Sequence, residues 1–210
     1  MTIEGTPGNS DSVAKVISLL FHPLFMPLYG LLIIFSAPTL LGYLPLAVKK
    51  ILLVIITINN VLIPLTLLPF FRFRNVISSY AIEDRKERII PMLAVTFLYS
   101  VTSIIVYRLQ IPVFLKTIII ATAFLSLGVT LVNFWWKISV HSVGAGALVA
   151  LVFFLSVKMY TALTWHLIGV ILVGGVVLSS RLRLNSHTPA QVWAGFALGL
   201  LGIAFFMLVF

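Results

Sequence analysis

The stretch SSRLRLNSHTPAQ, residues 179–191, decides how the chain around it folds. It is a polar island between two apolar runs, residues 162–179 and 190–210. Each run has about the length that a helix needs to cross the hydrocarbon core of a bilayer. The sequence therefore places this island where the chain leaves a membrane and enters it again.

The end of the same stretch carries the signals of a helix start. Thr188 is a preferred N-cap residue, and Pro189 suits the first helical position. His187 therefore lies at a helix N-terminus, where unpaired backbone N–H groups and the helix dipole favour an anion. Arg181 and Arg183 add full positive charges at the same place. The local chemistry predicts binding of a phosphate or a carboxylate.

The composition excludes a soluble domain. Of 210 residues, 61% are hydrophobic and 9% are charged, and the mean hydropathy is +1.18. The apolar runs are about 20 residues long rather than alternating strands of about ten residues, which favours helices over a β-barrel. The predicted fold is an all-α, polytopic membrane helical bundle. The chain has no cysteine, which excludes a disulfide, a thiolate metal site and a thiol nucleophile.

We expect a single integral-membrane domain over residues 1–210, with a polar N-terminal tail at 1–12. The first apolar segment contains Pro23 and Pro27 and could begin as an interfacial helix, so the prediction is about six or seven transmembrane helices. The apolar segments lie at 14–38, 44–70, 90–108, 112–135, 141–158, 162–179 and 190–210.

Seven spans would place the longer polar connections on one side of the membrane. The N-terminus and the connections 71–89, 136–140 and 180–189 then share a face. The net charge of +9 predicts contact with anionic lipid and control of topology rather than nucleic-acid binding. No acidic residue follows position 87, so any carboxylate chemistry would use the cluster at 83–87. The orientation in the membrane stays open, because the same cations could bind an anion instead.

Two further polar stretches would reach the same face. EDRKERIIP, residues 83–91, is either a solvated loop of mixed charges or a phosphate-binding segment. WWKISVHSVGAG, residues 135–146, places tryptophans at the membrane interface and His141 about one turn into the next span. Ionisable residues at that depth usually face a polar cavity or a partner. The alternative is an interfacial histidine bonded to a backbone carbonyl.

Two histidines at one face allow a specific chemistry. His187 and His141 can divide a phosphoryl transfer that needs no metal, in which one imidazole attacks phosphorus and the other protonates the leaving oxygen. Arginine and lysine side chains would hold the equatorial oxygens. His22 and His166 are expected at the membrane interface rather than in this site.

The spacing of the polar residues resembles a known signature. Ser180-Arg181, His187 five residues later and Gln191 after three more are similar to the pattern Ser-Arg-x5-His-x3-Asp, with glutamine in place of the aspartate. Together with the stretches upstream of it, this pattern resembles the type 2 phosphatidic acid phosphatase superfamily over residues 70–205.

The other two parts of the family signature are similar in fewer positions. Of Pro-Ser-Gly-His, the chain has Ser139 and His141. Of Lys-x6-Arg-Pro, it has Lys86, Arg88 and Pro91 but no Arg-Pro pair. The three parts follow one another in the family's order.

The resemblance implies a role for each matched residue. His187 would be the nucleophile that forms a phosphohistidine, and His141 would protonate the leaving alcohol. The phosphate would be held by Arg181, Ser139, Lys86 and Arg88, with Arg183 as an extra candidate. The family needs no metal, and we expect no cofactor.

Gln191 is the main departure from the family. Its amide oxygen can accept a hydrogen bond from imidazole Nδ1 and orient the ring, but it cannot stabilise an imidazolium as a carboxylate does. Asp84 or Glu87 could replace the missing carboxylate from across the site. We expect slower chemistry, or an inactive homologue that carries or binds anionic lipid.

The residues and the resemblance together predict a membrane lipid phosphatase. Its substrate would be a phosphomonoester or diphosphate of a lipid, such as phosphatidic acid, phosphatidylglycerol phosphate, a polyprenyl diphosphate or a lipid A phosphate. Transfer to an alcohol other than water is an alternative. The expected partners are this substrate and bilayer lipids, without nucleic acid or an obligatory protein partner. The expected location is a bacterial inner membrane, with the side of the site left open.

Overall fold

A computed structural model describes residues 9–80, 82 and 84–210 of the chain. These residues form helices and connecting turns, and no strand occurs among them. The elements are α1 (Asn9–Leu20), η1 (Pro23–Phe25), α2 (Met26–Ser36), η2 (Leu40–Tyr43), α3 (Leu46–Ile56), η3 (Thr57–Leu62), α4 (Ile63–Phe73), α5 (Ile89–Arg108), α6 (Val113–Asn133), α7 (Val140–Lys158), α8 (Thr164–Arg183) and α9 (Pro189–Val209).

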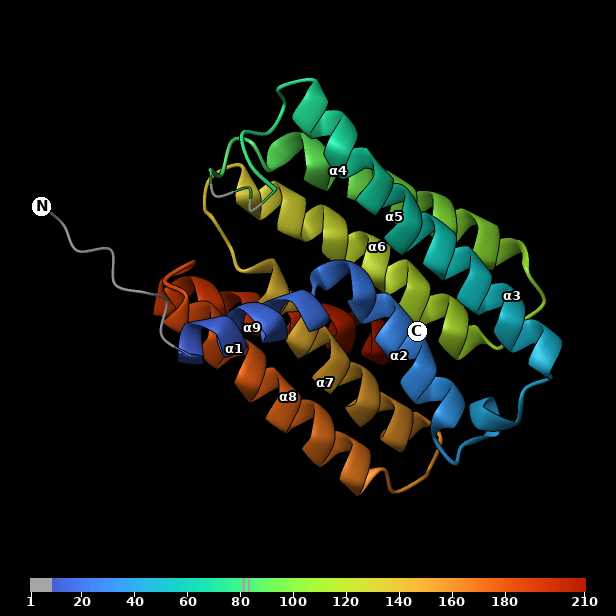
Figure 1. The fold of residues 1–210 in the computed structure, drawn as a ribbon. Coiled ribbons are helices and arrows are strands. Elements are labelled where there is room, and N and C mark those ends of the chain that lie inside the picture. The colour runs from blue at the N-terminus through green and yellow to red at the C-terminus, as the bar shows by residue number, and fades with distance from the viewer. Residues whose placement is uncertain (1–8, 81, 83) are drawn as a thin grey trace, which may run out of the picture.

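The protein is an all-α integral membrane bundle, as predicted. Seven helical segments within the described residues are long and apolar enough to cross a membrane. Five of them are the single helices α5 to α9, and the other two, Asp11–Ser36 and Leu46–Phe73, are composite. In Figure 1, α4, α5 and α6 lie on one side of the bundle and α7 and α8 on the other, with α2 between them.

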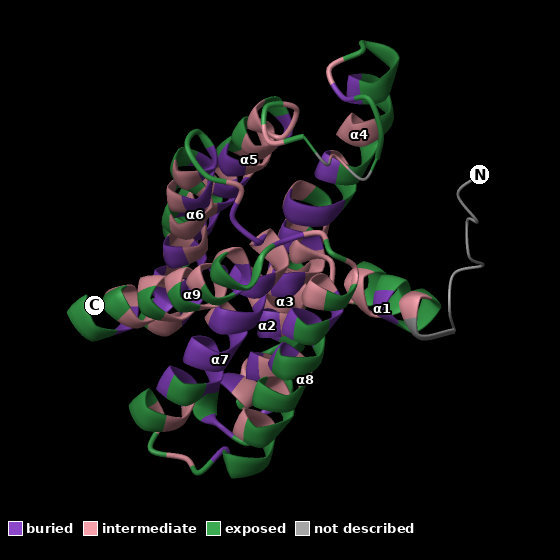
Figure 2. Cartoon of the chain, turned by 90° about the vertical axis from the view of Figure 1, so that its left-hand side faces the viewer, coloured by how far each residue is buried: buried purple, intermediate pink, exposed green. Residues whose placement is uncertain are grey.

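The first composite segment is broken where the sequence places its prolines. α1 ends at Leu20, and the short helix η1 begins at Pro23. The Tyr29 hydroxyl donates to the Leu20 carbonyl at 2.7 Å and fixes the bend. Figure 2 shows α1 projecting sideways from the bundle. Because α1 begins at Asn9, the helix starts inside the predicted polar tail, and the rest of that tail, residues 1–8, lies outside the described residues.

The second composite segment runs through a π-helical turn. η3 joins α3 to α4, and Pro64 is the second residue of α4. Proline removes a backbone donor, and π-turns widen the helix locally. Asn60 in this turn is buried and accepts a hydrogen bond from the Thr102 hydroxyl of α5 at 2.6 Å. The turn is therefore held against α5 by a polar contact inside the bundle.

The helices α7 and α9 pack backbone against backbone. A Cβ added at Gly146 would collide with the Phe196 carbonyl oxygen, and one added at Gly199 would collide with that of Val143. Small residues permit this approach, which is how membrane helices associate without a hydrophobic driving force between them. The pair therefore forms the closest interhelical contact zone around the site.

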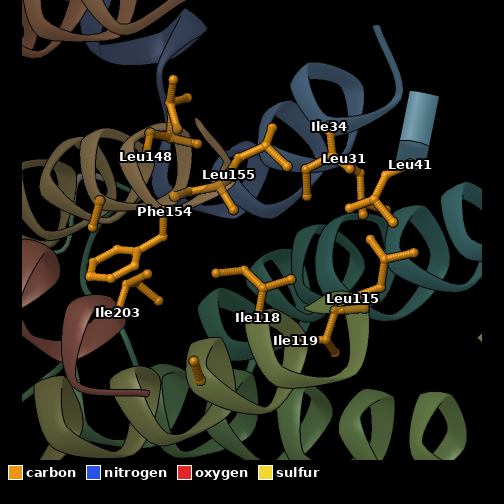
Figure 3. Packing of buried hydrophobic residues seen from close by; sticks show 14 of the residues in the cluster. Leu31, Ile34, Leu41, Leu115, Ile118, Ile119, Leu148, Phe154, Leu155 and Ile203 are labelled. Carbon is orange, nitrogen blue, oxygen red and sulfur yellow. The ribbon is translucent and has the colours of Figure 1, made fainter. Parts of the chain in front are cut away.

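The largest apolar cluster fills the space between α2, α6, α7 and α9. Figure 3 shows Leu31 and Ile34 of α2, Ile118 of α6 and Ile203 of α9 among the side chains that gather there. Ile34 and Ile203 are almost fully buried. These side chains therefore form the apolar interior between the four helices.

Candidate functional site

Local signals hold His187 between two helices. Asn185 adopts a left-handed conformation with φ 49°, which ends α8 as asparagine commonly does after a helix. Thr188 then accepts from the Gln191 backbone N–H and begins α9, and the Gln191 side chain returns the bond in a capping box. His187 thus follows a helix end and immediately precedes the next N-cap.

Gln191 orients the His187 ring, as the sequence predicts. His187 Nδ1 lies 3.1 Å from Gln191 Oε1, which also accepts the Thr188 backbone N–H at 3.2 Å. Since an amide oxygen only accepts, Nδ1 carries the ring proton and Nε2 keeps its lone pair. His187 is 7% exposed, so its ring is fixed within the protein rather than solvated.

The environment of His187 keeps its ring neutral. Burial lowers the pKa of His187 from 6.5 to about 4, and the charges of Arg88, Arg181 and Lys137 act in the same direction. The hydrogen bond to Gln191 opposes this effect only in part. At neutral pH the imidazole therefore has an available lone pair, which is what a nucleophile requires.

A backbone contact brings the second predicted stretch to the same place. The Ser139 N–H donates to the Gln191 carbonyl at 3.3 Å, which joins the start of α7 to the start of α9. His141 lies in the first turn of α7, and its Nε2 is 3.0 Å from the Ser18 carbonyl oxygen. Because a carbonyl only accepts, His141 donates from Nε2 and leaves Nδ1 as the second nitrogen.

Arg181 reaches inward from the last turn of α8. Its Nη1 donates to the Ser18 hydroxyl at 3.2 Å. Its Nε is buried and has no hydrogen-bond acceptor among the described residues. An unpaired buried guanidinium donor is costly unless an anion accepts from it. Arg181 is therefore a candidate anion-binding group.

One cavity of about 810 Å³ collects these groups. Arg181, His141 and His187 all line it, as predicted for residues that face one pocket. Its wall also includes the apolar side chains of Leu31, Ile34, Ile118 and Ile203. No Asp or Glu lines it within the described part of the chain. The further basic side chains along its wall are Lys15, Arg88 and Lys137.

Three predicted phosphate-binding residues lie outside this cavity. Ser139 is fully buried and caps α7, where its hydroxyl accepts from the Ser142 hydroxyl at 2.9 Å. Lys86 is exposed in the turn that precedes α5. Arg183 points to α1 and forms an ion pair with Asp11 at 3.1 Å. The site that we describe retains only Arg181 and Arg88 of the phosphate-binding set.

The two carboxylates that could replace the family's aspartate have other hydrogen-bond partners. Glu87 accepts from the backbone N–H and the hydroxyl of Ser78, both at 2.9 Å. Asp84 accepts from the Lys86 N–H at 2.8 Å, within its own turn. Glu83, the remaining member of that cluster, lies outside the described residues. Gln191 is thus the group that contacts His187 Nδ1.

The N-terminal segment supplies residues that the sequence did not predict for the site. His22 lines the cavity, and its ring centroid is 5.5 Å from that of His141. Ser18 binds both Arg181 and His141, and Lys15 lies on the cavity wall. One signal was available: His22 directly precedes a helix-breaking proline, much as His187 precedes Thr188-Pro189. The expectation that His22 is only interfacial is therefore replaced by a place in the site.

No cluster of three or more His, Cys, Asp or Glu residues arranged to hold a metal occurs in the part of the chain that the structure describes. No family model matches the chain, and neither a curated protein nor a solved structure matches it. The chemistry of the site is therefore inferred from its own residues.

Proposed function

We propose that this protein is a membrane lipid phosphatase that hydrolyses a phosphomonoester or a diphosphate on a lipid through a phosphohistidine intermediate. One observation carries the proposal. His187 is held through Nδ1 by Gln191, and its cavity also contains the unpaired guanidinium nitrogen of Arg181 and the second imidazole of His141. The spacing of these residues, which resembles the type 2 phosphatidic acid phosphatase signature, supports the same chemistry.

In the first half of the reaction, the Nε2 lone pair of His187 attacks phosphorus. The N–P bond forms while the bond from phosphorus to the leaving oxygen breaks. Arg181 and Arg88 balance the charge on the equatorial oxygens, the term that dominates catalysis of phosphoryl transfer. The substrate enters as a monoanion, and His141 passes the proton of that phosphate through Nδ1 to the leaving oxygen, since its Nε2–H is engaged with the Ser18 carbonyl.

In the second half, water attacks the phosphohistidine. Neutral His141 takes the proton from that water, the N–P bond breaks and inorganic phosphate leaves. The imidazole of His187 recovers its lone pair. Gln191 holds the ring throughout, but it leaves the positive charge on the phosphorylated imidazole uncompensated, so slower turnover than with an aspartate is expected.

The apolar part of the cavity supports a lipid as the substrate. Leu31, Ile34, Ile118 and Ile203 line the same space as the basic groups, so a headgroup and part of its tail share one compartment. Candidate substrates are phosphatidic acid, phosphatidylglycerol phosphate, a polyprenyl diphosphate and a lipid A phosphate. We propose a bacterial inner membrane as its location, because such lipids are handled there.

Gln191 also favours a second candidate function. Without a carboxylate behind His187, the same cavity could bind or carry an anionic lipid without turnover. Transfer of the phosphoryl group to an alcohol other than water is a third use of the same intermediate. The three functions share the anion site and differ in what happens to the phosphorus bond.

The test uses the full-length protein in nanodiscs with chelator present. We expect release of phosphate from phosphatidic acid or a polyprenyl diphosphate, inhibition by vanadate, and an acid-labile phosphoenzyme. His187→Ala should lower turnover by at least about 1000-fold. His166→Ala is the matched control, since His166 does not line the cavity. Retained turnover in His187→Ala would remove the nucleophile, and lipid binding without turnover in the wild type would favour the carrier.

A further inference from the structure

Two groups of polar side chains meet at Arg181. On one side is His187, whose pKa is lowered by burial and by the charges of Arg88, Arg181 and Lys137. On the other side is the N-terminal segment, where Ser18 accepts from Arg181 and from His141. Arg181 is thus common to both groups.

The second group contains a histidine with a fixed tautomer. His22 Nδ1 accepts from the Leu24 backbone N–H at 3.4 Å and caps η1. The ring proton is therefore on Nε2, which makes neutral His22 a hydrogen-bond donor at that nitrogen. The ring lines the cavity at 5.5 Å from His141 and is edge-on to it. No acceptor for Nε2 is found among the described residues, so a ligand is a suitable partner.

This second group has more donors than a leaving alcohol can use. An alcohol presents a single oxygen, which His141 alone can protonate. With Arg181 shared with the terminal phosphate, His22 Nε2 and the Lys15 ammonium would then face the cavity without an acceptor from the substrate. Donors that face a ligand cavity form their strongest hydrogen bonds with ionised acceptors, so the arrangement fits a leaving group with several anionic oxygens.

We propose that the N-terminal segment completes a second phosphate subsite, formed by Arg181, His22 and Lys15, and that the substrate is a lipid diphosphate. This inference rests on the proposed function for the role of His187. The terminal phosphate lies at His187 with Arg88 and Lys137. The phosphate that carries the lipid lies across Arg181, at His22.

The reaction is balanced with this substrate. His187 Nε2 forms a bond to the terminal phosphorus, and the bond from that phosphorus to the bridging oxygen breaks. The electron pair stays on the bridging oxygen, so a lipid monophosphate leaves. Water then cleaves the phosphohistidine to inorganic phosphate and regenerates the imidazole. Because a phosphate is a better leaving group than an alkoxide, this substrate also places less demand on the imidazole that Gln191 supports.

Binding tests the subsite without requiring turnover. The probes are hexadecyl methylenediphosphonate and hexadecyl phosphonate, which share a tail and resist cleavage. In nanodiscs, the full-length His187→Ala protein should bind the diphosphonate about tenfold more tightly than the phosphonate, a difference expected of one to two charge-assisted hydrogen bonds. Adding His22→Asn, which keeps an acceptor for the Leu24 N–H but removes the distal nitrogen, should bring the ratio close to one.

His166→Asn in the same background is the matched control and should keep the tenfold ratio. Equal affinities in the parent protein, or an unchanged ratio with His22→Asn, would overturn the second subsite. If His22→Asn does not fold, competition of the two probes against wild-type protein gives the same ratio. If the protein prefers the diphosphonate but has no phosphatase activity, the proposed function is wrong and the second subsite stands. If it hydrolyses a monoester and shows no preference for the diphosphonate, the proposed function stands and the second subsite is wrong.

Discussion

The two halves of the bundle are built in opposite ways. α7 and α9 touch through glycines, with Gly146 against the Phe196 carbonyl and Gly199 against that of Val143. The half formed by α2 to α5 is interrupted, by the break at Pro23, the π-turn η3 and Pro64. The uninterrupted pair carries His141 and His187 at its N-terminal ends, whereas the interrupted half borders the cavity.

The difference separates two requirements of a membrane site. The reacting groups need a fixed distance, which close backbone packing supplies. The ligand needs space within an apolar interior, which irregular helices provide by packing less closely. Between α7 and α9, the Ser139 N–H donates to the Gln191 carbonyl at 3.3 Å. This bond ties the start of α7 to the residue that orients His187.

The largest effect is expected from a substitution that forces α7 and α9 apart. Gly199→Ala would place a Cβ 2.9 Å from the Ala147 nitrogen and against the Val143 carbonyl. We expect a loss of roughly 2–3 kcal/mol in the free energy of unfolding from overpacking. A displacement of about 1 Å between the imidazoles would also lower turnover about 100-fold. Thermal unfolding and phosphate release measure the two effects.

Gly175→Ala on α8 is the matched control for that substitution. Gly175 is exposed, and a Cβ there would meet nothing within 4 Å. It should leave stability and turnover near their wild-type values. Equal behaviour of the two variants would contradict a spacing role for the α7–α9 contact.

The next largest effect is expected at Gln191, the residue of α9 that holds the His187 ring. Gln191→Leu removes the acceptor for Nδ1 and one half of the capping box, so turnover should fall by about 10- to 100-fold, with a stability cost of about 1 kcal/mol. Gln191→Glu keeps both hydrogen bonds and adds the missing charge. It should raise the pKa of His187 and increase the rate of phosphoenzyme formation. If Gln191→Glu formed the phosphoenzyme more slowly than the wild type, position 191 would not assist His187 as the family's aspartate does.

A smaller effect concerns the pH dependence of the same ring. Burial and neighbouring cations lower the pKa of His187 to about 4, so lowering the pH to 5.5 should leave its lone pair available. For an imidazole with the ordinary pKa of about 6.5, the fraction of rings with a free lone pair would fall roughly tenfold between neutral pH and about pH 5.5. Carbethoxylation of His187 by diethyl pyrocarbonate, followed by peptide mapping, measures this without substrate.

Arg88→Met tests the electrostatic part of that shift, which adds to the effect of burial. Since the Arg88 charge lowers the pKa of His187, removing it should move the acid limb of carbethoxylation upward. An acid limb near pH 6.5 in the wild-type protein would show that the ring is solvated rather than buried.

The smallest effect is expected in the interrupted half. Thr102→Val removes the 2.6 Å hydrogen bond to Asn60 and should cost about 1 kcal/mol of stability, with turnover unchanged within about twofold. Thr66→Val is the control, because Thr66 is exposed and bonds only the Ile63 carbonyl of its own helix. A large loss of turnover in Thr102→Val would mean that η3 also fixes the site.

Local rules were enough to predict the fold and the position of His187. The apolar runs identified the membrane-crossing segments, and Thr188-Pro189 marked the start of α9. The contact between His187 and Gln191 also follows from sequence, because residues four apart at a helix start lie on the same side. These features depend on neighbours along the chain.

The remaining parts of the site depend on distant contacts. Nothing in the sequence shows that α1 packs on α8, so Ser18 and His22 could not be paired with Arg181 and His141. The sequence also does not determine where a long cationic side chain points, and Arg183 pairs with Asp11 instead of lining the cavity. Ser139 was assigned to the ligand, whereas its buried hydroxyl is used to start α7.

The place of Ser18 has a consequence for how the protein responds to its solvent. Its helix, α1, exposes Val13, Val16 and Leu19 on the outer surface, while Ser18 itself binds Arg181 and His141. Amphipathic helices of this kind are retained by the interfacial layer of lipid headgroups and acyl chains. We therefore expect harsh detergents, which strip that layer, to abolish the proposed phosphatase activity while the remaining helices stay assembled, and reconstitution to restore it. The bilayer would then act as a structural component of the site as well as the source of the proposed substrate.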